Sequence, residues 1–277
     1  MRPPGPVADA DGPSRSSQQE TVRPVLLGAS LKLYLDVDAS VAWATSLAEI
    51  ARAHPAVVAG DVRLFILPSL PALDRVITAV AGSPISVGAQ DLFWAERGAY
   101  TGAVSGADLA RLGCRYVEVG HAERRHVFGE DDAIIRRKLA AAVRNGLTPV
   151  LCVGEETQQE ADLAGETCIA QIESAIADAD DLDDLVVAYE PEWAIGQAEP
   201  AAPEHVTAVV AQLRSHLARR GLAGAAVIYG GSAKPGLLST LSSGVDGLFL
   251  GRFAHEPQAF ASIIDEAVGT HREGEEP

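Results

Sequence analysis

The sequence predicts an α/β protein and, within that class, a single domain built as a closed (β/α)8 barrel. Three observations lead to this prediction. The chain has 277 residues, and a barrel of this kind typically needs about 250. Short apolar runs alternate along it with longer amphipathic stretches, which is typical of parallel strands connected by helices. Eight such runs occur between residues 24 and 268, with no linker-like break among them.

The predicted strands are mostly continuous apolar runs, as expected for parallel strands that are covered on both faces. They comprise residues 24–30, 62–68, 85–90, 115–120, 148–154, 184–190, 225–231 and 246–251. Helices are predicted over residues 40–53, 131–145, 163–177 and 203–220, where apolar residues recur every three or four positions. Asn145-Gly146 is typical of a helix end, and Pro203 of a first helical turn.

A doubly wound sheet is the main alternative to a barrel. That fold normally carries a GxGxxG turn after its first strand, whereas this chain has GASLKL at residues 28–33. One domain over residues 23–268 is therefore predicted. A disordered Pro/Ser/Gln-rich extension is predicted at 1–22, and a disordered acidic tail at 269–277.

Composition and charge argue against several classes of function. The net charge is −16, with 22 basic and 38 acidic side chains, so a nucleic-acid partner is not expected. No apolar run reaches the roughly 18 residues of a membrane span, and the N-terminus lacks the apolar core of a signal peptide. The three cysteines form no CxxC pair, which argues against a zinc site or a disulfide framework and favours the cytoplasm.

Three chemically capable side chains follow three different predicted strands, where barrel enzymes place their active sites. Lys32 comes after the first strand, and a lysine among apolar residues needs an anionic partner if it is buried. His121 comes after the fourth strand at a helix start, where the helix dipole favours the neutral ring. Glu190 follows the sixth, so a partly desolvated carboxylate suited to a general base is expected there. Taken singly, a surface lysine or a structural histidine is an equally simple interpretation.

The turns after the last three strands predict a lid and a phosphate site. Pro191 and Gly196 bracket an apolar loop, which has little reason to stay exposed unless it closes over a ligand. Glycines and a serine follow the last two strands, where barrels bind phosphate through backbone N–H groups. These residues are Gly230, Gly231, Ser232 and Gly251.

Several motifs together resemble the triosephosphate isomerase family over residues 24 to 268. Besides Gly28 and Lys32 of a GxxxK pattern, they are VGAQ (87–90), AYTG (99–102), GHAERRHVFGE (120–130), PVLCVGE (149–155), AYEPEWAIG (188–196), IYGGS (228–232) and VDGLFLG (245–251). Their order and spacing are those of the family. The resemblance implies the TIM barrel fold and a homodimeric isomerase without metal or cofactor, which acts on a small phosphorylated sugar.

The resemblance also implies roles for individual residues. Glu190 would be the base that moves the proton, His121 would polarise the carbonyl, and Lys32 would stabilise negative charge. Glu123 would position Lys32, and Thr101 would reach into the neighbouring subunit's site. The residues that would hold the phosphate are Gly196, Ser232, Gly230, Gly231 and Gly251.

Around these groups the chain departs from the family pattern. Ser30 stands where the family has an asparagine that touches the substrate, and Ala122 replaces a serine. Tyr34 replaces another asparagine, Glu192 an apolar lid residue, and Arg252 a glycine. Isomerisation of glyceraldehyde 3-phosphate and dihydroxyacetone phosphate, in glycolysis and gluconeogenesis, is the leading prediction. The alternative is a tetrulose phosphate such as L-erythrulose 1-phosphate, because Ser30 would leave room for one more hydroxymethyl group. A barrel that only binds phosphate would have no reason to keep the charged trio.

Overall fold

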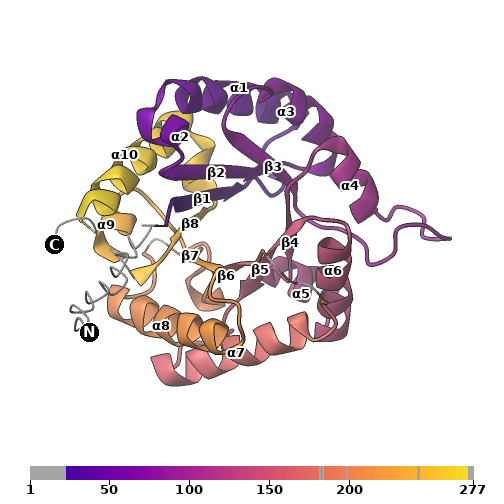
Figure 1. The fold of residues 1–277 in the computed structure, drawn as a ribbon, viewed down its shortest axis with the longest axis vertical. Coiled ribbons are helices and arrows are strands. Elements are labelled where there is room, and N and C mark those ends of the chain that lie inside the picture. The colour runs from indigo at the N-terminus through magenta and orange to yellow at the C-terminus, as the bar shows by residue number, and fades with distance from the viewer. Residues whose placement is uncertain (1–22, 181, 183, 198, 242–243, 274–277) are drawn as a thin grey trace, which may run out of the picture.

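The computed structural model describes residues 23–273 except 181, 183, 198, 242 and 243. Its eight strands are all parallel, and they pair in chain order from β1 to β8 and back to β1, so the sheet closes. The helices form a ring outside the strands (Figure 1). The predicted single-domain (β/α)8 barrel is confirmed, and the doubly wound alternative is excluded.

Each predicted strand range contains one observed strand. The strands are β1 Val25–Ser30, β2 Val62–Leu67, β3 Ile85–Ala89, β4 Tyr116–Val119, β5 Thr148–Val153, β6 Val186–Tyr189, β7 Ala226–Tyr229 and β8 Gly247–Leu250. The residues that follow them, where the charged side chains were predicted, therefore gather at one end of the barrel.

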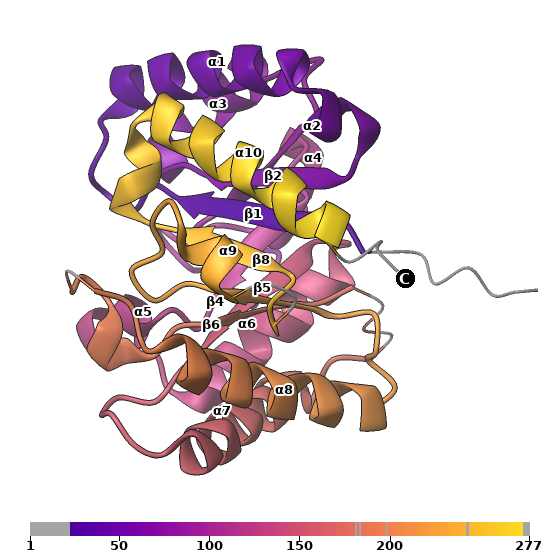
Figure 2. The ribbon, with the colours of Figure 1, turned by 90° about the vertical axis from the view of Figure 1, so that its left-hand side faces the viewer.

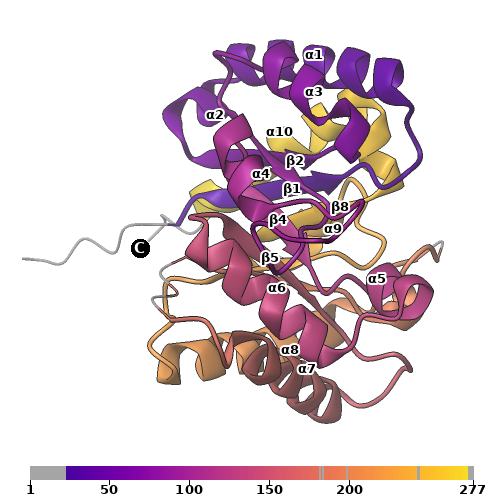
Figure 3. The ribbon, with the colours of Figure 1, turned by 90° about the vertical axis from the view of Figure 1, so that its right-hand side faces the viewer.

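The helices cover the barrel on all sides; α1 and α3 lie on one flank and α7 and α8 on the opposite one (Figures 2 and 3). The α-helices are α1 Val37–Ala53, α2 Pro55–Ala59, α3 Leu73–Ala79, α4 Gly106–Leu112, α5 Ala122–Phe128, α6 Asp132–Arg144, α7 Ala161–Ile176, α8 Pro203–Arg219, α9 Leu237–Leu241 and α10 Pro257–Glu273. Short 3-10 helices are η1 Leu70–Ala72, η2 Glu192–Ala194 and η4 Arg252–His255.

All four predicted helices are present, but the first begins earlier than predicted. Asp36 caps α1, because its carboxylate accepts a hydrogen bond from the Ala39 amide at 2.8 Å. An aspartate at this position satisfies an amide that the helix leaves unpaired, so α1 starts at Val37 instead of Ser40. At the other end of the chain, α10 continues to Glu273, so the predicted start of a disordered tail at 269 is wrong. The predicted disorder of residues 1–22 and 274–277 lies outside the described residues.

Large apolar side chains fill the barrel below its open end. Phe65 stacks on Tyr116 and Phe249, with ring centroids 4.6 and 5.8 Å apart, and it occupies the space that a side chain on Gly28 would need. Because side chains alternate along a strand, the next inward positions toward the strand ends carry polar groups. They are Ser30, Glu118 and Glu190, and all three are buried.

No helix in the described part of the chain is long and apolar enough to cross a membrane.

Candidate active site

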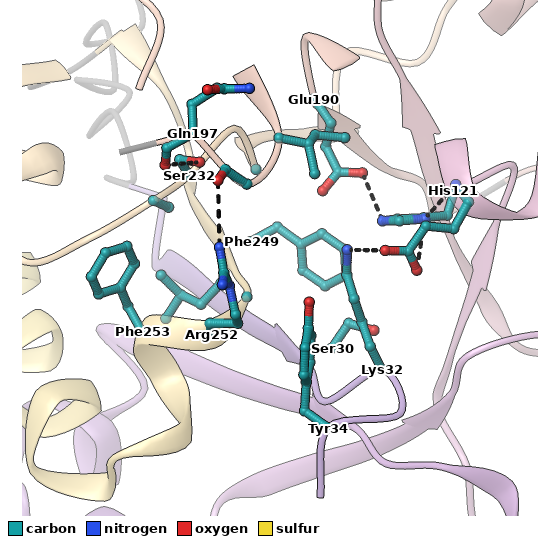
Figure 4. Close-up of a pocket in the computed structure, with 17 residues that line it drawn as sticks. Ser30, Lys32, Tyr34, His121, Glu190, Gln197, Ser232, Phe249, Arg252 and Phe253 are labelled. Carbon is teal, nitrogen blue, oxygen red and sulfur yellow. Dashed lines mark hydrogen bonds and ion pairs between the residues drawn. The ribbon is translucent and has the colours of Figure 1, made fainter. Parts of the chain in front are cut away.

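A cavity of about 710 Å³ lies at the carboxyl ends of the strands. Glu190, His121 and Lys32 point into it from β6, β4 and β1 (Figure 4). The predicted phosphate residues Gly196, Ser232, Gly230 and Gly251 line it as well. The structure therefore brings together residues that are as much as 219 positions apart, from Lys32 to Gly251.

Glu190 is buried, and its surroundings hold the carboxylate in one place. Its backbone N–H donates to the Val153 carbonyl at 2.8 Å. A Cβ on Gly230 would lie 2.5 Å from Oε1, so only glycine leaves room for the carboxylate. Oε2 has no hydrogen-bond partner among the described residues and lies 3.7 Å from Nε2 of His121. This oxygen is available to a substrate proton.

His121 is held in one orientation at the start of α5. Its Nδ1 accepts a hydrogen bond from the Glu123 backbone N–H at 3.1 Å. An imidazole that accepts at Nδ1 carries its proton on Nε2, and that nitrogen faces the cavity and Glu190. The ring is therefore poised to donate a hydrogen bond to a substrate oxygen.

Lys32 reaches the cavity through an unusual backbone conformation, with a φ of +48°. The Gln90 side chain stabilises this turn, since its amide donates to the carbonyls of Lys32 and Leu67 at 3.0 and 2.9 Å. The ammonium group donates to Glu123 at 2.8 Å. Burial lowers the pKa of Lys32, but Glu190 and Glu123 outweigh this and raise it, so the group stays charged. Burial raises the pKa of Glu123, but the hydrogen bond and the positive charge of Lys32 outweigh this effect, so the pKa of Glu123 is lowered overall.

The opposite end of the cavity is made of turns. Ser232 has a φ of +51°, and its hydroxyl donates to the carbonyls of Ala194 and Gln197 at 2.8 and 3.1 Å, which joins this turn to the predicted lid. Arg252 lines the cavity and donates to the Gly196 carbonyl at 3.4 Å. Figure 4 shows Ser232 and Gln197 at the side of the cavity away from His121 and Lys32.

Two of the predicted phosphate residues have a different role. The Gly230 N–H already donates to the Tyr189 carbonyl at 2.9 Å as part of the sheet, so the prediction that it binds phosphate is wrong. Gly231 does not line the cavity; a Cβ there would lie 2.4 Å from the Tyr229 hydroxyl. Both glycines provide room for neighbouring side chains.

The predicted lid begins with the 3-10 helix η2. Trp193 is anchored, because its indole N–H donates to buried Glu155 at 2.8 Å. Glu192 forms an ion pair with His126 of α5, which connects the lid hinge to the helix that His121 caps. The hydrogen bond that His126 donates to the Glu192 carboxylate raises the pKa of His126 above its ordinary value.

This ion pair predicts a pH-dependent contribution to stability. Because the folded-state pKa of His126 is raised, the contribution is fully present below about pH 6.5 and is lost as the pH rises through the folded value. His126→Gln should lower the melting temperature at pH 6 by no more than about 2–4 °C, since an exposed pair contributes at most about 1 kcal/mol. At pH 9 the two proteins should melt together; a difference that persists there would contradict the prediction. Thermal unfolding monitored by circular dichroism measures both.

Two residues near the site were missed from the sequence, and the structure places one predicted site residue, Thr101, outside the cavity. Thr101 is exposed on the loop between β3 and α4, which projects from the barrel (Figure 1), and it does not line the cavity. Gln90 was noted only as part of a motif, and no signal in the sequence connects it with Lys32. Glu118 was missed although a single acidic residue in the apolar run RYVEVG was a visible signal.

A buried carboxylate, an oriented imidazole and an ammonium group face one cavity at the mouth of a (β/α)8 barrel. This fold and site define an isomerase that moves a proton between two adjacent carbons, as aldose–ketose isomerases do. The family model described as triosephosphate isomerase matches residues 25–267. The chain belongs to the triosephosphate isomerase family.

Curated relatives differ in their names. The chain is 52% identical over 249 residues to an L-erythrulose-1-phosphate isomerase of Pectobacterium atrosepticum, covering 88% of this chain and 96% of the relative. It is 39% identical over 247 residues to a triosephosphate isomerase of a Synechococcus species, covering 88% and 97%. A triosephosphate isomerase of Moorella thermoacetica is 42% identical over 220 residues, covering 76% and 88%.

Proposed function

We propose that this enzyme isomerises L-erythrulose 1-phosphate, the alternative in the sequence analysis, rather than a triose phosphate. The observation that carries the proposal is the sequence identity of 52% to the L-erythrulose-1-phosphate isomerase. The identity to the two triosephosphate isomerases is 39% and 42%, over comparable or shorter lengths. Ser30 supports it, because it lines the cavity beside Lys32 and is smaller than the asparagine of the family pattern.

The substrate's chemistry determines where the carbonyl goes. L-Erythrulose 1-phosphate is a triose ketose phosphate with a hydroxymethyl group added to the carbon farthest from the phosphate. Its carbonyl is at C2, so the acidic proton that leads to a new sugar is the one on C3. Proton transfer from C3 to C2 moves the carbonyl to C3 and leaves a ketose with the phosphate at the other end. On a triose phosphate the same transfer interconverts an aldose and a ketose.

In this proposal Glu190 takes the C3 proton with its unpartnered Oε2 and returns it to C2. His121 donates its Nε2 proton to the oxygen that gains negative charge and moves the proton between the two oxygens. Lys32 stabilises the enediolate electrostatically, and Glu123 positions Lys32 through the 2.8 Å contact. These groups lower the activation free energy of the isomerisation because they are oriented before the reaction begins.

The phosphate in this proposal lies at the end formed by Gly196, Ser232 and Gly251, with Arg252 beside it. Binding there draws the lid over the substrate, and the hydrogen bonds from Ser232 to Ala194 and Gln197 hold the lid to the turn after β7. A closed lid excludes water from the enediolate, which would otherwise eliminate its phosphate.

We also propose that the chain works as a homodimer. A second hollow of about 700 Å³ adjoins the site and is lined by Lys32 and His121 together with the apolar Phe93, Trp94 and Phe128. The projecting loop with Thr101 points away from its own barrel (Figure 1). A second copy would cover the part of the hollow lined by Phe93, Trp94 and Phe128 with this loop and bring its threonine toward Lys32.

Steady-state kinetics with the two substrates test the assignment. L-Erythrulose 1-phosphate should give a kcat/KM at least about 100-fold above that of dihydroxyacetone phosphate, because a site that hydrogen-bonds an extra hydroxyl discriminates at least this well. Both assays use the full chain at the same pH. A ratio near one, or a preference for the triose, overturns the tetrulose assignment in favour of triosephosphate isomerase.

A further inference from the structure

Glu118 is a second carboxylate inside the barrel, and the mechanism above does not use it. It lies on β4, two residues past Tyr116, whose ring packs on Phe65 in the barrel interior. The alternation along the strand turns Glu118 to the same interior, at the layer nearest the open end. Only 4% of the residue is exposed.

The contacts of Glu118 are few for a buried charge. Oε2 accepts a hydrogen bond from Ser30 at 2.8 Å. Oε1 accepts a long hydrogen bond from the Cys152 thiol at 3.9 Å and lies 4.0 Å from Nε2 of His121. No ion pair with a lysine or arginine is found for it among the residues that the structure describes. Burial and the nearby Glu190 carboxylate raise the pKa of Glu118, and the opposing effects of His121, Ser30 and Lys32 do not offset them.

Such a group is costly to the fold. A buried carboxylate with one strong hydrogen bond destabilises a protein relative to an apolar side chain of the same size. The layer of inward side chains directly below Glu118 is apolar, so the packing beneath it does not require a carboxylate. A functional reason for it must come from what binds beside it.

The place of Glu118 matches one end of the proposed substrate. The phosphate on C1 lies at the Ser232 and Gly251 end, and C2 and C3 lie between Glu190 and His121. C4 therefore projects past the reacting carbons, away from the phosphate. Glu118 and Ser30 line the hollow that continues the cavity on the His121 and Lys32 side.

We propose that Glu118, together with Ser30, binds the C4 hydroxymethyl group of the tetrulose phosphate and so selects it over a triose phosphate. This inference rests on the proposed function. The C4 hydroxyl donates to Oε1 of Glu118, whose existing hydrogen bond from the Cys152 thiol is long at 3.9 Å, while Ser30 holds Oε2. A triose phosphate has no C4, and it leaves the buried carboxylate without that bond. The loss of a hydrogen bond to a charged group costs about 1.5–3 kcal/mol.

Two variants test the role of the carboxylate. Glu118→Leu removes every hydrogen bond and should lower kcat/KM for L-erythrulose 1-phosphate by about 10- to 100-fold. Activity with dihydroxyacetone phosphate, which never uses the subsite, should stay within a few-fold. Glu118→Gln keeps a hydrogen-bonding group of the same shape and should retain part of the preference. Equal losses on both substrates in Glu118→Leu would mean a purely structural role and would overturn the inference.

A substrate analogue tests the same contact without altering the protein. The 4-deoxy form of L-erythrulose 1-phosphate has a methyl group where the C4 hydroxymethyl was. The unaltered enzyme should lose about as much kcat/KM with this analogue as Glu118→Leu loses with the natural sugar. Glu118→Leu should not distinguish the two sugars. If the variant does not fold, the analogue decides alone: equal rates with both sugars on the unaltered enzyme overturn the inference.

The outcomes separate this inference from the function it rests on. An unaltered enzyme that prefers the triose phosphate shows that the proposed function has failed, and the subsite with it. An unaltered enzyme that prefers the tetrulose phosphate but ignores the 4-hydroxyl keeps its proposed function and loses only the role of Glu118.

Discussion

Glu190→Gln should lower kcat by about 1,000-fold, because it removes the only group proposed to carry the proton between carbons. The amide has the shape of the carboxylate and fits the same space beside Gly230. The phosphate end of the cavity, formed by Gly196, Ser232 and Gly251, is untouched. The dissociation constant for the substrate should therefore change only a few-fold, which places the loss in the chemical step.

Single-turnover kinetics and calorimetric titration with the substrate measure the two quantities separately. Glu166→Gln is a matched control, since Glu166 is an exposed carboxylate on α7 outside the cavity lining. It should have the activity of the unaltered enzyme. Unchanged turnover in Glu190→Gln would remove Glu190 as the base.

Gly230→Ala should lower kcat by about 100-fold, because a shift of about 1 Å in a reacting group costs that much. An added Cβ would lie 2.5 Å from Oε1 and 2.6 Å from Cγ of Glu190, which are distances that real contacts do not show. The flexible Glu190 side chain would move, and the sheet hydrogen bond from Gly230 to Tyr189 would remain. The fold should persist while the base leaves its position.

Gly224→Ala is the matched control, because a Cβ there meets nothing within 4 Å. Gly224 lies in the turn before β7, so this variant tests whether an added methyl group away from the site disturbs the enzyme generally. Full activity in Gly230→Ala would show that the Glu190 side chain can adopt a second productive position, and it would contradict the tight fit. Thermal unfolding of both variants shows whether the barrel itself is preserved.

The features of the fold that could be predicted come from local patterns. A parallel strand buried on both faces needs a continuous apolar run, and all eight runs became strands. The start of α1 was misplaced because Asp36 acts through a side-chain contact with Ala39 that apolar spacing does not reveal. The end of α10 was misplaced because charged residues in a terminal helix resemble a tail.

The sequence alone determines more than the fold. Lys32, His121 and Glu190 each follow a different strand, and parallel strands end on the same side of the barrel. The sequence therefore places all three residues at one barrel mouth. Only the tertiary structure decided how these groups are held. Gly230 had been assigned to the phosphate because neighbouring glycines share one local signature, whereas its role depends on Glu190, which is 40 residues away in the chain. In the sequence Glu118 is one acidic residue in a predicted strand. Only the closed barrel brings its Oε2 within 2.8 Å of the Ser30 hydroxyl. Contacts of this kind depend on which side chains meet across the barrel interior, and strand periodicity carries no information about them.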